Sequence, residues 1–181
     1  DRCEYVITGN TFNVSPWISS VVLMDDRGIM NPDIYVPTLA LIKNNNFNLA
    51  EGSTGISCMN TMDSQVRNNH FSGMAAKGVY VDGADVYNLL LYPPVYIGTG
   101  EAKNALILGN NFNGLTSTEA DIVLGENSFN CTVVGNGKDD VIDLGTNNKI
   151  VGMKKMHGGN HAGPTIRDNF RMMPRHGHHT H

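Results

Sequence analysis

Apolar and polar positions recur along the chain in one short phrase, Ile/Val-x-Gly/Asn-Asn-x-Phe. The phrase occurs at residues 7–12, 42–47, 66–71 and 107–112. Side chains alternate faces along a β-strand, so the Ile and the Phe, five positions apart, would lie on opposite faces of one straight strand. Both side chains are large and apolar, and both can be buried only if the chain bends between them. Each copy therefore predicts a strand, a bend and a second strand.

The bend is expected at the Gly or Asn of the phrase, because these residues reach left-handed backbone angles at low cost. These positions are Gly9, Asn44, Asn68 and Gly109. The next residue is asparagine in every copy: Asn10, Asn45, Asn69 and Asn110. If the copies stack, these asparagines lie about 4.8 Å apart. Their side-chain amides can then bond to one another in a ladder, as in other stacked β structures.

A second apolar segment follows each phenylalanine after about eight residues. These segments are residues 21–24, 55–58, 78–81 and 121–124. A weaker fifth repeat runs over 132–145, and a sixth begins at 150–152. The first Phe-to-Phe spacings are 35, 24 and 41 residues, which indicates a short repeat unit with insertions. Repeats of this length predict an architecture in which each unit contacts only its neighbours.

This pattern resembles the right-handed parallel β-helix family, the pectin-lyase-like superfamily, over roughly residues 5 to 152. The resemblance implies an all-β fold, a right-handed parallel β-helix or solenoid of about five to six coils. We expect the β-helix to occupy residues 1–152. Residues 153–181 would form a short capping helix within 164–173 and a flexible His-rich tail. The fold hosts many activities and does not specify a function.

Composition narrows the class of partner. The net charge of −4 does not favour nucleic acid, and no apolar run is long enough to predict membrane insertion. Only 17% of the residues are charged, which suits a stacked fold whose turns carry uncharged polar residues. Cys58 and Cys131 are expected to point inward as small core residues. We expect an extracellular or cell-surface protein that requires no cofactor.

The two longer repeats gain their extra residues at the same place. The insertions are residues 25–37 and 85–101, and the connection between them in the stack is short, at 59–64. Two long loops would thus flank a groove. Its predicted lining is acidic and aromatic, which suits polysaccharide or other glycan by stacking and hydrogen bonding. The lining residues are Asp25, Asp26, Tyr35, Asp63, Asp82, Asp85, Tyr87, Tyr92 and Tyr96. Alternatively, the tyrosines pack their own loops onto the coils.

Asp139 and Asp140, followed by Asp143, form the densest acidic cluster. The phrase at 137–143 is similar to the paired-Asp motif of polygalacturonases, and glycoside hydrolysis uses two carboxylates on one face. The segments at 156–159 and 166–168 do not match the other motifs of that family. Asp139 and Asp140 are thus the candidate catalytic residues of an alternative function, a polysaccharide lyase or glycoside hydrolase acting on acidic polysaccharide. The other interpretations are that the aspartates cap turns or bind Ca²⁺. We favour a non-catalytic module.

The two ends of the chain suggest further partners. Four histidines near the C-terminus are candidate ligands for an adventitious transition metal: His176, His178, His179 and His181. The first repeat begins near residue 5, which leaves one end of the stack bare. The favoured interpretation is that further coils lie upstream. The alternative is that the bare end packs on another molecule, so that the protein assembles with itself by end-to-end stacking.

Overall fold

The structure is a computed structural model of the 181-residue chain, and it describes residues 4–24, 39–88, 91–136, 140–152 and 154–156. Within these ranges the chain is all-β, and nearly all strand pairs are parallel. The described part contains no helix, and hence none with the length and apolar character to cross a membrane. The capping helix expected within 164–173 and the His-rich tail lie outside the described residues.

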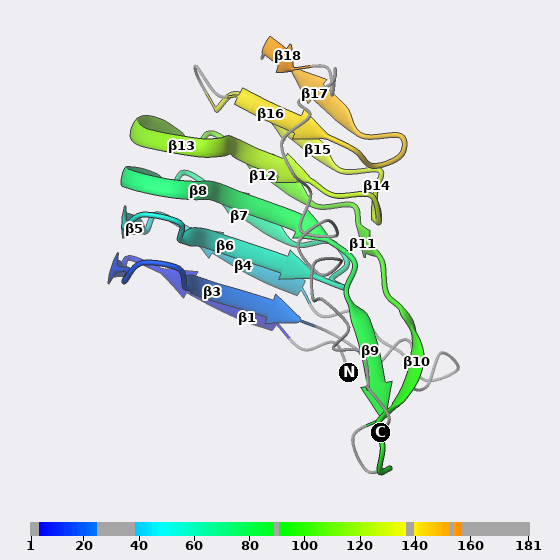
Figure 1. Ribbon diagram of the computed structural model, residues 1–181. Coiled ribbons are helices and arrows are strands. Elements are labelled where there is room, and N and C mark those ends of the chain that lie inside the picture. The colour runs from blue at the N-terminus through cyan, green and yellow to red at the C-terminus, as the bar shows by residue number, and fades with distance from the viewer. Residues whose placement is uncertain (1–3, 25–38, 89–90, 137–139, 153, 157–181) are drawn as a thin grey trace, which may run out of the picture.

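Two parallel sheets lie face to face and enclose the core (Figure 1). The strands of the first sheet are, in spatial order, β1 (Glu4–Thr8), β4 (Leu39–Lys43), β7 (Gln65–Arg67), β12 (Leu106–Leu108), β15 (Thr132–Val134) and β17 (Lys149–Val151). The strands of the second sheet are β2 (Thr11–Asn13), β3 (Ser19–Met24), β5 (Asn46–Leu49), β6 (Thr54–Met59), β8 (His70–Asp82), β13 (Asn111–Leu124), β16 (Asp140–Asp143) and β18 (Lys154–Met156).

Two short strand pairs complete the described structure. The pair β11 (Ala102–Lys103) and β14 (Ser128–Phe129) is parallel. The pair β9 (Asp85–Asn88) and β10 (Val95–Thr99) is antiparallel, and it projects away from the two sheets (Figure 1). The sequence predicts an insertion at 85–101 but not its hairpin form. We call β9, β10 and the residues between them the aromatic hairpin.

The recurring phrase forms the corner between the two sheets, as predicted. The bend residues all have positive φ, including Asn44 at 56° and Gly109 at 65°. The residues that follow them form one asparagine ladder: Asn10, Asn45, Asn69, Asn110 and Asn136. In each step the backbone N–H and the Nδ2 of one asparagine both donate to the Oδ1 of the next, at 2.9–3.2 Å. The ladder thus extends into the weaker fifth repeat.

The phenylalanines of the phrase stack inside the corner. Phe12, Phe47, Phe71 and Phe112 follow one another with ring centroids 4.6–4.8 Å apart and nearly parallel planes. This spacing equals the distance between hydrogen-bonded strands, so one ring fits each repeat. A Cβ added to Gly78 would lie 2.6 Å from Cε1 of Phe112. The aromatic stack therefore requires glycine at that position of the preceding repeat.

Two features differ from the sequence expectation. The two strands predicted on either side of residues 73–77 merge into the single strand β8, and the same happens in β13 with irregularities in register. A second column of positive-φ residues, which the sequence reading missed, lies at the entrance to the first sheet. Its members are Asp63, Asn104, Asn130 and Asn147. Each stands two residues before the strand that follows it, and that regular position was the available signal.

Candidate functional site

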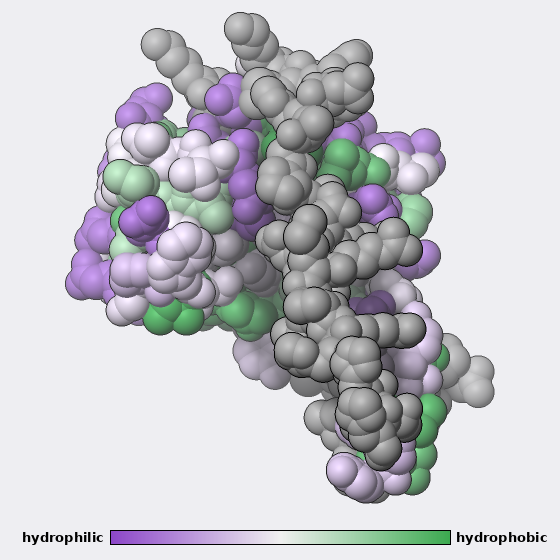
Figure 2. Space-filling view, in the orientation of Figure 1, coloured by the Kyte–Doolittle hydropathy of each residue, from purple (hydrophilic) through white to green (hydrophobic). Residues whose placement is uncertain are grey.

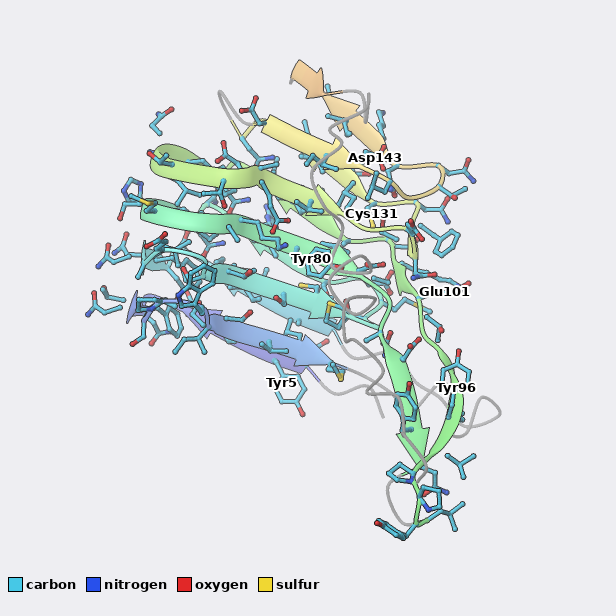
Figure 3. All side chains as sticks on the ribbon, viewed as in Figure 1. Tyr5, Tyr80, Tyr96, Glu101, Cys131 and Asp143 are labelled. Carbon is cyan, nitrogen blue, oxygen red and sulfur yellow. The ribbon has the colours of Figure 1, made fainter. Side chains whose placement is uncertain are left out.

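The aromatic hairpin carries three of the six tyrosines of the chain. Tyr87 on β9 lies opposite Tyr96 on β10, and their rings meet edge to face with centroids 5.6 Å apart. Both side chains are about half exposed, and Tyr92 is 100% exposed. Figure 3 shows Tyr96 on the hairpin, well away from Tyr80 and Cys131 in the body of the stack. The hairpin therefore presents aromatic surface to solvent.

A chain of hydrogen bonds holds one edge of this surface. The Thr99 hydroxyl donates to Oδ1 of Asp85 at 2.6 Å, and the Tyr96 hydroxyl lies 2.6 Å from Thr99 Oγ1. Because the Thr99 proton is directed to Asp85, the Tyr96 hydroxyl donates to Thr99. The Asp85 side chain is itself exposed to solvent. The rings of Tyr87 and Tyr96 and the carboxylate of Asp85 are thus held in fixed positions relative to one another.

Asp82 and Asn60 lie at the base of the hairpin and accept hydrogen bonds from backbone N–H groups. Asp82 accepts hydrogen bonds from the backbone N–H of Gly83 at 2.7 Å and of Asn127 at 2.9 Å, and from the Tyr80 hydroxyl at 2.6 Å. Burial, together with this hydrogen bond, raises the pKa of Tyr80. Asn60 is buried, and its Oδ1 accepts from the backbone N–H of Ala84 at 2.6 Å. These contacts fix where the hairpin leaves the stack.

The predicted groove is only partly described. Asp85, Tyr87 and Tyr96 come together on the hairpin, and Tyr92 belongs to the same element. Asp63 lies apart from them at a corner of the first sheet, with φ of 60°, and accepts a hydrogen bond from Asn104. Three predicted lining residues lie outside the described residues: Asp25, Asp26 and Tyr35.

A separate acidic cavity opens between β13 and the start of β16. Its volume is about 280 Å³. It is lined by Phe112, Asn113, Leu115, Ser117, Glu119, Ala120, Asp121 and Asp140. One of the two candidate catalytic residues, Asp140, thus lies in a cavity, whereas Asp139 lies outside the described residues. Neighbouring Asp143 accepts hydrogen bonds from Gly145 and Asn148, which is the geometry of a turn cap.

Asp121 is the residue of this cavity that the sequence reading missed. It accepts a hydrogen bond from the Ser117 hydroxyl, and its Oδ2 lies 3.4 Å from the backbone N of Asp140. Burial raises the pKa of Asp121, and the charge of Asp140 adds to this shift. Glu119 is held by Lys77 at 2.6 Å. No sequence motif marked this pair, because only the register of β13 and β16, which aligns 122–124 with 141–143, brings residues 121 and 140 side by side.

The described ranges were searched for metal ligands and for reactive cysteines. No group of three or more His, Cys, Asp or Glu residues that could hold a metal ion occurs there. The candidate metal ligands His176, His178, His179 and His181 lie outside these ranges. Cys58 and Cys131 are unpaired and fully buried, in agreement with their prediction as core residues. Burial raises the pKa of the Cys58 thiol to about 12, with a smaller contribution from Cys131.

Comparisons with protein-family models, curated proteins and solved structures gave no match.

Proposed function

We propose that the chain is a right-handed parallel β-helix of the pectin-lyase-like type that acts as a non-catalytic extracellular or cell-surface module and binds polysaccharide. The β-helix is assigned to residues 1–152, and a C-terminal cap and tail to 153–181. The asparagine ladder, the aromatic stack and the parallel register of successive repeats support the fold assignment. Each repeat contributes one strand or strand segment to each sheet, as one coil of a solenoid does.

The observation that carries the binding function is the exposure of the tyrosines on the aromatic hairpin. Tyr92 makes no packing contact that would bury it, since it is fully exposed. Tyr87 and Tyr96 pack on each other but keep about half of their surface in solvent. These facts speak against the alternative that the tyrosines serve to pack the loop. Tyrosine combines an apolar face with a polar tip, which suits stacking on a sugar ring and hydrogen bonding to its hydroxyls.

The charges of the hairpin point to an uncharged polysaccharide. Over the described hairpin residues 85–88 and 91–99, Asp85 is the only ionisable acidic or basic side chain besides the tyrosines. A carboxylate accepts hydrogen bonds from sugar hydroxyls but repels the carboxylates of an acidic polysaccharide. The proposed ligand is therefore a neutral polysaccharide with exposed hydroxyl groups.

Affinity electrophoresis in gels containing neutral or acidic polysaccharides tests this function. We expect retardation by at least one neutral polysaccharide. Tyr92→Ala and Tyr96→Ala should each weaken binding about two- to tenfold, the equivalent of about 0.5–1.5 kcal/mol for an aromatic contact. Tyr5→Ala, which removes an exposed tyrosine on β1, is the control and should bind like the unmodified chain. Absence of retardation in every gel, or equal binding by all variants, would overturn the proposal.

A second candidate, polysaccharide lyase or glycoside hydrolase activity, is supported by the acidic cavity. Two carboxyl groups meet there, and the raised pKa of Asp121 favours the protonated form that a general acid requires. Reducing-sugar and unsaturated-product assays on acidic polysaccharides distinguish this candidate from the binding module. Activity that disappears in both Asp121→Asn and Asp140→Asn would establish it in place of the non-catalytic function. Absence of product on every substrate would exclude it.

A further inference from the structure

Asparagine followed directly by glycine occurs twice in the sequence, at Asn113-Gly114 and at Asn136-Gly137. In such a pair the backbone nitrogen of the glycine can attack the side-chain carbonyl carbon of the asparagine. Glycine favours this attack because it has no Cβ to obstruct the approach and allows the backbone a wide range of angles. The two pairs have the same chemistry, so a difference between their reactivities must come from the fold.

The fold locks the side chain of Asn136, which is a buried member of the asparagine ladder and 3% exposed. Its Oδ1 accepts hydrogen bonds from the backbone N–H and from Nδ2 of Asn110, both at 2.9 Å. Its Nδ2 donates to the backbone oxygen of Ile107 at 3.1 Å. Attack requires the amide to turn toward the next backbone nitrogen in the chain, and this rotation would break all three hydrogen bonds. Asn136 is therefore protected.

Asn113 has the opposite environment. Asn113 and Gly114 are both exposed on β13. Within the described part of the chain, the Asn113 side chain makes no hydrogen bond, so its amide can rotate without losing a partner. The strands β8 and β13 both bend at the same side of the stack (Figure 1), and the surface on that side is mainly polar (Figure 2). Water, which deamidation consumes, thus has direct access to Asn113.

The backbone of β13 is irregular at this position. Asn111 stands opposite His70 of β8 and Gly114 opposite Ser72, so β13 has one residue more than β8 in this interval. An extra residue of this kind is a β-bulge, which disrupts the ladder locally and departs from extended strand geometry. The backbone N–H of Asn113 donates to Oδ1 of Asn111 at 2.9 Å. The bulge therefore relaxes the constraint by which a regular strand keeps an asparagine side chain away from the next backbone nitrogen.

We propose that Asn113 is a site of spontaneous deamidation, at which the chain gains a carboxylate in the lining of the acidic cavity. The backbone nitrogen of Gly114 forms a bond to Cγ of Asn113, and the bond from Cγ to Nδ2 breaks. The proton of the Gly114 N–H leaves with Nδ2 as ammonia. Water then opens the resulting cyclic imide at either of its two carbonyls, which gives aspartate or isoaspartate. The reaction consumes one water molecule and needs no enzyme, oxidant or cofactor.

The modification changes the charge of the acidic cavity. Asn113 lines this cavity together with Asp121 and Asp140, whereas Glu119 is paired with Lys77. A carboxylate in place of the amide makes the lining more negative by one charge, and like charges in one site disfavour each other's ionisation. The converted chain therefore differs at this cavity from the freshly made chain. This modification does not depend on the proposed polysaccharide binding, which uses the aromatic hairpin.

Incubation of the full 1–181 chain in mildly alkaline buffer, folded or unfolded in guanidinium chloride, tests the proposal. Peptide mapping by mass spectrometry, with a sample taken at zero time as reference, measures conversion at both Asn-Gly pairs. In the folded chain we expect Asn113 to convert at least about tenfold faster than Asn136, because three hydrogen bonds must break at Asn136. In the unfolded chain the two rates should become similar, since only the local sequence then acts.

Asn113→Gln is the matched variant, because glutamine keeps an exposed amide but would have to form a larger ring, which is much slower. It should abolish the acidic species that isoelectric focusing detects as the folded chain ages. A folded chain in which Asn113 stays unconverted would overturn the proposal. So would equal rates at Asn113 and Asn136 in the folded chain, or an acidic species that persists in Asn113→Gln, since the fold would then not direct the reaction to Asn113.

Discussion

Replacing Asn69 by alanine removes the central member of the asparagine ladder. The Asn69 side chain makes four hydrogen bonds, all buried or nearly so. Its Oδ1 accepts from the backbone N–H and from Nδ2 of Asn45, both at 3.0 Å. Its Nδ2 donates to the backbone oxygen of Ile42 and to Oδ1 of Asn110, also at 3.0 Å. Asn69 is 1% exposed, so water does not reach these partners in the intact protein.

The cost of the substitution follows from the groups that lose their partner. Oδ1 of Asn110 still accepts from the backbone N–H of Asn69. Two donors are left unpaired, the backbone N–H of Asn45 and one Nδ2 proton of Asn45, whereas the carbonyl of Ile42 lies within the paired strands β4 and β7. A buried polar group without a partner costs about 1–3 kcal/mol. We therefore expect Asn69→Ala to lower the free energy of unfolding by at least about 2 kcal/mol, a large part of the 5–15 kcal/mol typical of a domain.

Asn10 is the matched control, because it belongs to the same ladder and its side chain is exposed. Asn10→Ala removes two hydrogen bonds donated by Nδ2, but Oδ1 of Asn45 still accepts from the backbone N–H of Asn10. We expect a loss of about 1 kcal/mol or less. Urea unfolding followed by circular dichroism measures both values. Equal losses in the two variants would refute the argument that the burial of stranded partners sets the cost.

Three further expectations concern the core and the acidic cavity. Gly78→Ala should lower the free energy of unfolding in urea by about 1–3 kcal/mol, because the new Cβ would lie 2.6 Å from Phe112. In Gly9→Ala the new Cβ meets no atom within 4 Å, so this variant should lose only the free energy that corresponds to the strain of its positive φ. Equal losses in the two variants would contradict this expectation. Because burial raises the pKa of Asp121 in the folded state, the folded chain binds more protons than the unfolded chain between the two pKa values, and stability falls as pH rises through that window. Asp121→Asn should thus raise the melting temperature relative to the unmodified chain at about pH 7 but not at about pH 3, below the unfolded value; a benefit at both pH values would rule out this cause. The Cys58 thiol has a pKa raised to about 12 and no exposed surface, so it should resist alkylation at neutral pH and react after unfolding in urea. Peptide mass mapping measures the labelling. Rapid labelling of the native protein would show that the core opens.

The candidate site was predictable only in part. Tyr87 and Tyr96 were expected near Asp85 because they share one insertion, but their edge-to-face pairing depends on the register of β9 and β10. The sequence analysis predicted Asp82 and Asp63 as carboxylates that line a ligand-binding groove. In the structure they accept hydrogen bonds from the chain itself, because turns between stacked repeats leave backbone N–H groups and amides that need acceptors. A carboxylate in a sequence does not reveal which of these two uses it has.

The order of the stack was contained in the sequence. The spacing of Asn45, Asn69 and Asn110, with a phenylalanine two residues after each, predicted the corner, the ladder and the ring stack, because these depend on contacts between equivalent positions of adjacent repeats. Local repetition therefore carries long-range structure in this fold.

Only the tertiary structure decided what lies outside the repeat. It joined the two expected strands of β8 and β13, folded the second insertion into a hairpin and set Asp121 beside Asp140. None of these follows from a repeated phrase, because each depends on a register or an edge that exists only once the repeats have stacked.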